Sequence, residues 1–458
     1  MAEPEHYSLP TPAEKAVFPP GLHHAWRFAL FNGLSFPLVV GSPMFLYAKT
    51  LHASATALGL IAGMMPLLVV FQIPAVGYIN RIGFKRFVIT GWSSRILFSL
   101  GIALVPLTAG FLDVPTRLVL ILALLFGFNL VRGISSCAWL PWITALIPDT
   151  LRGKYVARDT AMTSLGCFLA VLTAAASLGE TPRPWQFTGV FVFSAAMGLI
   201  SVGFLKRIPD VAISEQARTS RTPVPWLAML RHPPFRKLLR TVLAWAVAYG
   251  GITAFTVAYL KTETTLTDGT ILLVTSVAFL GGLSSLWFLG SRLDHLGSKP
   301  VVSFAFGIWI LILAGWMALA GGALTARLPF VIALQFLMGL FAALVNMSNN
   351  RLAMVVIPAM GRSHFFALYS VISNVALGLA PIAWGLLIDA IGHRHASYLG
   401  LDWNRYTVFF AAAALVFALA LALARRLEEP KAASLEMLLT EMLITSPQRF
   451  WLRFWPRG

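Results

Sequence analysis

A group of polar side chains interrupts a long apolar segment near residue 130. Asn129, Arg132 and Ser136 are three and four residues apart, so they share one face of a helix. An arginine in apolar surroundings is costly unless it meets a partner, and its planar fork suits an anion. We therefore expect these residues to bind a small anionic or zwitterionic solute. The alternative is a structural arginine that is satisfied by helix-end carbonyls or by Asn129.

Other polar side chains lie inside other apolar segments. They are Asn32, Ser35, Tyr249, Thr253, Asn346 and Asn350. Any one of them could equally serve as hydrogen-bonding glue between helices. For Arg95, near one end of its segment, we expect a structural role. It would either snorkel to the surface or pair with an acid such as Asp159.

Acidic side chains avoid the middle of every apolar segment. All 18 Asp and Glu residues lie in connections or at segment ends. Buried carboxylates are the usual proton carriers because burial favours their protonated form, so the sequence gives proton coupling little support. The chain has no P-loop, no HExxH and no GxGxxG after a strand. We therefore expect neither an enzyme nor a bound cofactor or metal.

The composition excludes an ordinary soluble enzyme. Apolar residues make up 58% of the 458 residues and charged residues 12%, against about 45–50% and about 25% in soluble proteins. The net charge is +17, and the basic residues lie mostly between apolar segments. They predict contact with anionic lipid headgroups and no contact with nucleic acid.

Twelve apolar segments are long enough to cross a membrane as helices. Six lie within residues 26–205 and six within 238–424. The flanking residues 1–25, 206–237 and 425–458 are predicted to be an N-terminal tail, a loop between the two groups and a C-terminal tail that is partly an interfacial amphipathic helix. The segments are 26–48, 56–79, 87–110, 117–146, 157–178, 187–205, 238–260, 269–289, 301–321, 328–357, 364–388 and 405–424. Isolated strands cannot satisfy their backbone in lipid, so the predicted fold class is all-α integral membrane.

The basic residues also predict the orientation. With both termini in the cytoplasm, cytoplasmic segments hold 25 Lys and Arg residues and the opposite side holds seven. Cytoplasmic loops of membrane proteins carry the excess of basic residues. Both termini and the loop between the two groups are therefore expected to be cytoplasmic.

The two groups of six segments repeat each other. Three short stretches recur in the same order at offsets of 210 to 214 residues. The matched pairs are "FLYAKT" (45–50) with "VAYLKT" (257–262), "GYINRIGFKR" (77–86) with "GSRLDHLGSKP" (290–300), and "IPDTLRGKYVA" (147–157) with "IPAMGRSHFFA" (357–367). Six segments separate the copies, so both start on the same side of the membrane. The predicted symmetry axis therefore runs along the membrane normal.

With these features the sequence resembles the major facilitator superfamily of secondary transporters over residues 25–425. In that family the connection after the second helix reads G-x-x-x-D-R-x-G-R-R. The C-terminal copy fits with Gly290, Asp294, His295, Gly297 and Lys299, and the N-terminal copy has Asn80 in place of the acid, then Arg81, Gly83, Lys85 and Arg86. The stretch "WLPWITALIPDTLRGKY" is similar to a bacterial branch of the superfamily. The resemblance to this branch implies that the protein lies in the bacterial inner membrane, but it implies no particular substrate.

The resemblance implies that these connections act as a gate. Their glycines allow a tight turn with positive φ directly after a helix. The family's acid holds the two halves together when the cytoplasmic side is shut. Asp294 would then face the start of the fifth segment near Arg152 and Arg158, and Asn80 would face the start of the eleventh without a full charge. A carboxylate at a helix N-terminus gains about 0.3–1 kcal/mol. The alternative is that these stretches are ordinary basic loops with no role in gating.

The resemblance also implies a central cavity lined by the first, fourth, seventh and tenth helices. It therefore implies that the polar residues of those helices contribute to the binding site, namely Asn32, Ser35, Asn129, Arg132, Ser136, Tyr249, Thr253, Asn346 and Asn350. The expected function is secondary active or facilitative transport of a small solute by alternating access, carried out by a monomer. The alternative is a non-transporting assembly factor or receptor with the same fold. A wet polar cavity favours transport, and a space filled by apolar side chains favours the alternative.

Overall fold

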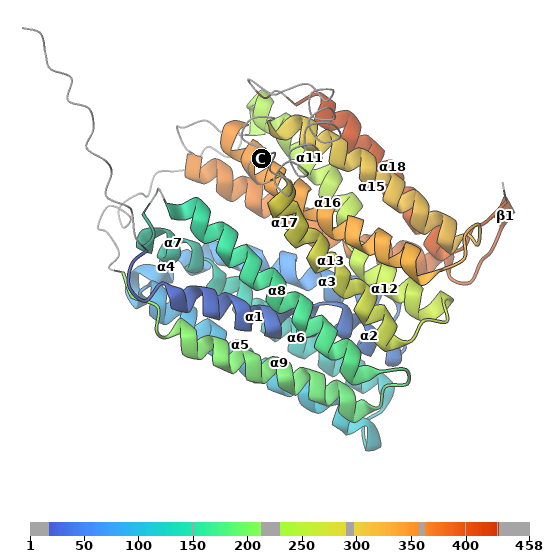
Figure 1. Ribbon diagram of the computed structural model, residues 1–458, viewed down its shortest axis with the longest axis horizontal. Coiled ribbons are helices and arrows are strands. Elements are labelled where there is room, and N and C mark those ends of the chain that lie inside the picture. Colours follow the sequence, from blue (N-terminus) through green and yellow to red (C-terminus); the bar gives the residue numbers. More distant parts are fainter. Residues whose placement is uncertain are drawn as a thin grey trace, which may run out of the picture.

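The computed structural model is almost entirely helical (Figure 1). It describes residues 18–148, 151–211, 230–289, 297–356, 362–398, 400–427 and 429. These residues contain twelve spans that are long and apolar enough to cross a membrane. Each span agrees with a predicted segment to within a few residues at either end. The predicted all-α fold with twelve membrane helices is therefore confirmed.

The first six spans are built from eleven helical pieces. They are α1 (His23–Val40), α2 (Ser42–Thr50), α3 (Ala55–Leu67), η1 (Leu68–Phe71), α4 (Gln72–Ile82), α5 (Phe84–Leu104), η2 (Val105–Gly110), α6 (Val114–Ser136), α7 (Trp139–Leu146), α8 (Arg152–Leu178) and α9 (Pro184–Leu205).

The second six spans follow the same plan. They are α11 (Pro233–Tyr249), α12 (Ile252–Glu263), α13 (Asp268–Leu289), α15 (Ser298–Ala320), α16 (Leu328–Val356), α17 (Arg362–Ile391) and α18 (Arg405–Arg425). Between α17 and α18, the short strands β1 (Ser397–Tyr398) and β2 (Leu401–Asp402) pair antiparallel.

Short polar residues fix the start of several helices. The side chain of Ser54 accepts from the N–H of Ala57 at the start of α3. Asn404 accepts from the N–H groups of Tyr406 and Thr407 at the start of α18. Such caps satisfy backbone donors that the first turn of a helix leaves free. They set the point at which each chain segment enters its span.

The spans form two six-helix bundles that meet along two seams, α3 against α17 and α8 against α13. Small residues allow the backbones to approach closely there. A Cβ on Gly59 would lie 2.2 Å from the carbonyl oxygen of Pro381. In the other seam the N–H of Gly269 donates to the carbonyl of Gly179 at 2.8 Å. Small residues at such seams are typical of transmembrane helix packing.

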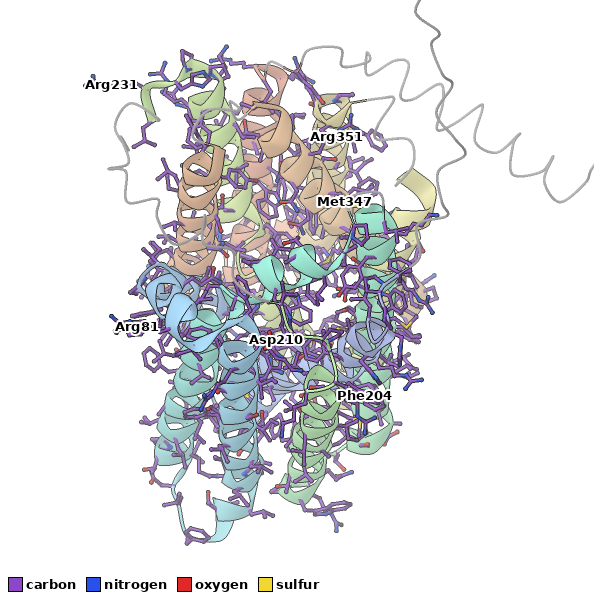
Figure 2. The ribbon with its side chains drawn as sticks, turned by 90° about the vertical axis from the view of Figure 1, so that its left-hand side faces the viewer. Arg81, Phe204, Asp210, Arg231, Met347 and Arg351 are labelled. Carbon is purple, nitrogen blue, oxygen red and sulfur yellow. The ribbon has the colours of Figure 1, made fainter. Side chains whose placement is uncertain are left out.

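The molecule has two ends that carry different parts of the chain. We call the end with the start of α1, Arg81 and Arg231 the tail face, and the opposite end, with Lys49, Asp389 and the β1–β2 hairpin, the hairpin face. In Figure 1, α4 and α7 lie at the tail face on the left and β1 at the hairpin face on the right. Figure 2 looks onto the tail face, with the C-terminal bundle above the N-terminal bundle.

Candidate functional site

A cavity of about 300 Å³ lies between the two bundles. Its N-terminal wall comes from α1, α2 and α8, and its C-terminal wall from α11, α12, α13, α15 and α16. The polar side chains in these walls are Ser42, Ser164, Tyr249, Thr253, Thr275, Gln335 and Asn346. Small-molecule sites have volumes of about 300–1,000 Å³ and apolar walls with a few polar groups. This cavity therefore has the size and lining that suit a small solute.

Three of the predicted binding residues line this cavity, namely Tyr249, Thr253 and Asn346. The ring of Tyr249 stacks on Trp245 with centroids 5.4 Å apart and meets Trp309 edge-on at 5.6 Å. These contacts hold the tyrosine ring in the C-terminal wall. Thr253 and Asn346 are exposed, so their polar groups are free to meet a solute. Asn350, one turn further along α16, is also exposed but is not part of this lining.

Gln335 was not expected from the sequence. It is 2% exposed and lines the cavity. Its Nε2 atom has no hydrogen-bond partner among the described residues. A buried amide without a partner is costly, so this donor suits a polar group of the solute. A single glutamine inside an apolar segment was the available signal.

Ser35 and Ser136 make hydrogen bonds inside the N-terminal bundle. The hydroxyl of Ser194 donates to the carbonyl of Ser35 at 2.7 Å. The side-chain amide of Gln72 donates to the hydroxyl of Ser136 at 2.6 Å. In this conformation both serines connect helices, which is the alternative that the sequence left open.

The remaining predicted residues of the N-terminal bundle lie around two arginines. Arg95 is 4% exposed, and its Nη2 donates to Oδ1 of Asn32 at 2.7 Å. The sequence left two alternatives for Arg95, snorkelling to the surface or pairing with an acid such as Asp159. In the structure Arg95 is buried with an amide partner, and the carboxylate of Asp159 accepts from the hydroxyl of Tyr155 at 3.3 Å. The sequence could not show that the partner would be an amide on another helix.

Arg132 and Asn129 lie on α6 close to this pair. The side-chain nitrogen of Asn129 donates to the carbonyl of Leu125 at 2.9 Å. Its Oδ1 atom and the Nη1 atom of Arg132 are buried and have no partner among the described residues. The guanidinium of Arg132 lies 5.1 Å from the ring centroid of Phe36 on α1. Arg132 is not one of the residues that line the central cavity in this conformation.

Two spans that border the cavity are broken at matching places in the repeat, a feature that we did not expect from the sequence. Gly41 separates α1 from α2, and Gly250 with Gly251 separates α11 from α12. Gly251 has φ of +83°, a conformation that favours glycine. The available signals were the Gly-Ser-Pro and Gly-Gly runs, which end one helix and start another. Broken helices are a common feature of transporter binding sites.

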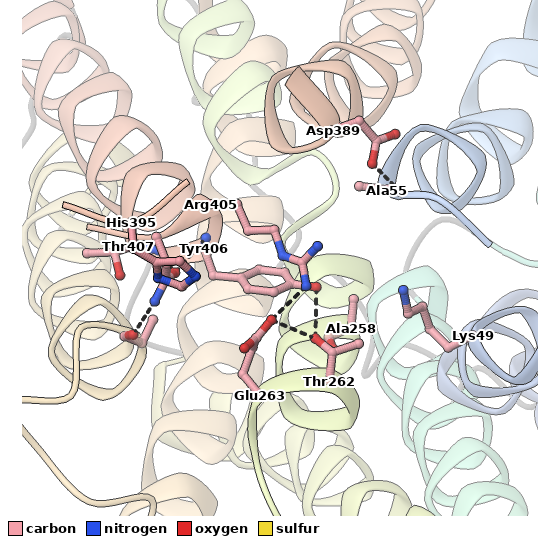
Figure 3. Close-up of polar contacts among 12 residues, drawn as sticks. Lys49, Ala55, Ala258, Thr262, Glu263, Asp389, His395, Arg405, Tyr406 and Thr407 are labelled. Carbon is pink, nitrogen blue, oxygen red and sulfur yellow. Dashed lines mark hydrogen bonds and ion pairs between the residues drawn. The ribbon is translucent and has the colours of Figure 1, made fainter. Parts of the chain in front are cut away.

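Hydrogen bonds join the two bundles at the hairpin face (Figure 3). The carboxylate of Asp389, near the end of α17, accepts from the N–H of Ala55 at 2.9 Å and from the N–H and hydroxyl of Thr56 at 2.8 and 2.6 Å. Ala55 and Thr56 are the first residues of α3, where N–H groups have no helical acceptor and the helix dipole favours a negative charge. We call this contact the Asp389 latch. Lys49 of the N-terminal bundle lies within electrostatic reach of Asp389.

Other charged contacts at the hairpin face stay within the C-terminal bundle. Arg405 donates to Glu263 at 2.7 Å, and Lys261 donates to Asp268 at 2.5 Å. These pairs connect α18 to α12 and α12 to α13. They stabilise one bundle, whereas the Asp389 latch connects both. In the sequence Asp389 was only an acid at a segment end.

The predicted gate residues at the tail face are only partly described. Gly83 and Gly297 have φ of +89° and +82°, so each has the turn conformation that its place next to a helix predicts. Arg81 and Arg86 are exposed. Asp294 and the side chains of Asn80 and Arg152 lie outside the described residues.

Two further residues of that predicted gate make contacts within their own bundle. The guanidinium of Arg158 lies 3.9 Å from the ring centroid of Trp26. The N–H of Lys299 donates to the carboxylate of Glu429 at 2.7 Å. Glu429 thereby caps the start of α15. The role of these residues as a gate remains a prediction.

The family model described as Major Facilitator Superfamily matches residues 28–267 and again 252–455. No curated protein matches this chain in sequence. Among solved structures, a D-xylose-proton symporter is 13% identical, with a TM-score of 0.68 over 90% of this chain and 98% of its own. A POT family transporter in complex with a thioalcohol-conjugated peptide is 13% identical (TM-score 0.66, 90% and 97% covered). The nucleoside transporter NupG is 15% identical (TM-score 0.59, 89% and 98% covered). At these identities the likeness concerns the fold.

Proposed function

This chain belongs to the Major Facilitator Superfamily, and from that premise we propose that it moves a small anionic or zwitterionic solute across the membrane by alternating access. The superfamily and the transporter folds that this chain resembles make it an integral membrane transporter and not an enzyme. The cavity between the two bundles is the observation that carries the proposal. Residues of both bundles form its walls, so a relative motion of the bundles changes its access.

The arrangement of the contacts supports a conformation that is closed at the hairpin face. Among the described residues, the Asp389 latch and the Gly269–Gly179 bond join the bundles, and both lie at that face. At the tail face the N-terminal bundle has a separate apolar core that includes Trp26, Trp92 and Trp142. The described members of that core all belong to the N-terminal bundle. These contacts thus hold the bundles together at the hairpin face.

The tail face is proposed to be the cytoplasmic side. Its connections carry most of the lysine and arginine residues, as cytoplasmic loops of membrane proteins do. Both termini then lie in the cytoplasm, and the basic residues meet anionic lipid headgroups. We also propose that the protein is a monomer in the bacterial inner membrane and makes no contact with nucleic acid.

The charge of the solute is inferred from Arg132. Its buried Nη1 atom has no partner among the described residues, and a buried cation in a membrane-spanning segment marks a functional site by default. The named neighbours transport or bind D-xylose, peptides and nucleosides, and none of these solutes is assigned to this chain.

The competing function is a membrane assembly factor or receptor that transports nothing. The cavity argues against it, because seven polar side chains contribute to the walls between the bundles. A scaffold has no need to place Gln335 and Asn346 in the wall of a cavity when apolar side chains would fill that space more favourably.

The direct test is uptake into proteoliposomes of a radiolabelled panel of organic acids, phosphate, amino acids, nucleosides and sugars. We expect saturable uptake of an anionic or zwitterionic member. Arg132→Lys retains the charge but loses the planar fork, so it should abolish most uptake at normal purified yield. Arg240→Lys is the matched control because Arg240 is exposed on α11. Normal uptake by Arg132→Lys would remove Arg132 from the binding site.

A further inference from the structure

Two guanidinium groups converge on one aromatic ring inside the N-terminal bundle. The Cζ atom of Arg95 lies 5.9 Å from the ring centroid of Phe36, and that of Arg132 lies 5.1 Å from it. Arg95 also lies 5.2 Å from the ring of Phe128 and 5.3 Å from that of Trp92. Both arginines belong to membrane-spanning segments. Both positive charges therefore lie within 6 Å of the centre of one ring inside the membrane-spanning part of the bundle.

These two charges have no counter-charge in the described part of the chain. The ion pairs among the described residues involve other groups. Arg95 has one amide oxygen as a partner, from Asn32. Arg132 has a free buried Nη1, and the neighbouring Asn129 has a free buried Oδ1. Contact with aromatic rings returns only part of the cost of burying a cation.

We propose that Arg95 and Arg132 together form one anion-binding site that takes a carboxylate or phosphate group of the transported solute. The site rests on the proposed function and deepens it, because it assigns the solute a carboxylate or phosphate group. The free Nη1 of Arg132 supplies a donor, and the amide of Asn32 together with the three rings holds Arg95 in a fixed orientation. Planar guanidinium forks bind the paired oxygens of carboxylates and phosphates.

The anion site and the central cavity involve consecutive residues of α1. Phe36 contacts both arginines, and the next residue, Pro37, lines the cavity. The two sites thus lie on neighbouring sides of the same stretch of helix, just before the break at Gly41.

The test measures binding to purified full-length protein and needs no transport. The probes are succinate and inorganic phosphate, with succinamide as the neutral counterpart of succinate. Melting temperature and tryptophan fluorescence are recorded against probe concentration, since Trp92 lies beside Arg95. We expect saturable stabilisation by at least one anion and none by succinamide. The anion that saturates at the lower concentration identifies a carboxylate or a phosphate site.

Four variants test whether the two arginines themselves hold the anion. Arg132→Gln and Arg95→Gln should each weaken anion binding at least tenfold, and Arg240→Gln, on the exposed surface of α11, should leave it unchanged. Arg95→Lys should fold and bind with intermediate affinity if Arg95→Gln yields too little protein. Without anion, Arg132→Gln should melt at the same temperature as the wild type or higher, because an unpaired buried charge has been removed.

Each outcome has a defined meaning. Anion binding that is unchanged in both Arg→Gln variants would overturn the site, and so would a clear fall in the melting temperature of anion-free Arg132→Gln. Transport of a neutral solute by a protein that binds no anion would overturn the site and leave the transport function intact. Anion binding that depends on both arginines, in a protein that transports no solute, would support the site and contradict the proposed function.

Discussion

Asp389→Asn tests the contact that joins the two bundles. The variant keeps the size of the side chain and one acceptor oxygen, and replaces the other oxygen by an amide that donates. In the wild type one carboxylate oxygen accepts from the N–H of Ala55 and the other accepts two bonds from Thr56. In the variant, either the bond from Ala55 or the two bonds from Thr56 lose their acceptor oxygen. The negative charge at the start of α3 also disappears.

The expected size of the effect follows from this geometry. The carboxylate acts on α3 as a helix cap supplied by the other bundle, and loss of a cap costs about 0.5–2 kcal/mol. Asp389 is exposed, so water screens its charge and an intermediate value is appropriate. A loss of about 1 kcal/mol changes the ratio of closed to open hairpin face by roughly fivefold.

The assay is the distance between spin labels on the two bundles at the hairpin face. Thr181 and Thr325 are suitable positions, because both are exposed in connections at that face. Asp389→Asn should increase the population with the longer distance about fivefold. Glu263→Gln is the matched control, since it removes the negative charge that pairs with Arg405 within the C-terminal bundle. The latch is refuted if Asp389→Asn leaves the distance distribution unchanged, or if Glu263→Gln shifts it equally.

Three further predictions concern topology, packing and the second gate. Ser220→Cys should react with an impermeant thiol reagent only after cells are permeabilised, and efficient labelling of intact cells would reverse the orientation. Gly59→Val should lower the melting temperature and reduce transport, because its Cβ would meet the carbonyl of Pro381 at 2.2 Å, whereas Gly189→Val, with nothing within 4 Å, should change neither. Asp294→Asn should shift the population toward an open tail face, by about tenfold or less for a loss of up to 1.4 kcal/mol, and Asn80→Asp should shift it the opposite way. Spin-label distances across the tail face check this, and equal shifts in the two variants would contradict a paired gate.

The spans could be predicted because membrane insertion depends on local composition. A helix of about 20 apolar residues satisfies its own backbone in lipid, and each of the twelve spans has this property. The turn conformations of Gly83 and Gly297 could be predicted for the same reason, since a glycine next to a helix end is a local signal. The broken helices at Gly41 and Gly251 also carried local signals, which were hidden inside otherwise continuous apolar segments.

The contacts of the site could not be predicted, because they join residues that are distant in sequence. The Asp389 latch connects residues 334 positions apart, and Arg95 finds Asn32 at a separation of 63. No residue next to Arg95 in the sequence indicated an amide partner. No residue next to Asp389 indicated that its carboxylate would accept from the N–H groups at the start of another helix. The sequence identified Tyr249, Thr253 and Asn346 as polar residues in spans, and the fold brings these three to one cavity.

Alternating access itself is tested most directly by the reactivity of one cavity residue from the two sides of the membrane. The protein is Asn346→Cys in a background of Cys137→Ser and Cys167→Ser, compared in membrane vesicles of opposite orientation with an impermeant thiol reagent. Asn346 lines the cavity, so its cysteine should react from the tail face and only slowly from the hairpin face. Adding Asp389→Asn should raise the rate from the hairpin face about fivefold. A cysteine that reacts from neither face, or whose reactivity from the hairpin face does not respond to Asp389→Asn, would contradict transport by alternating access.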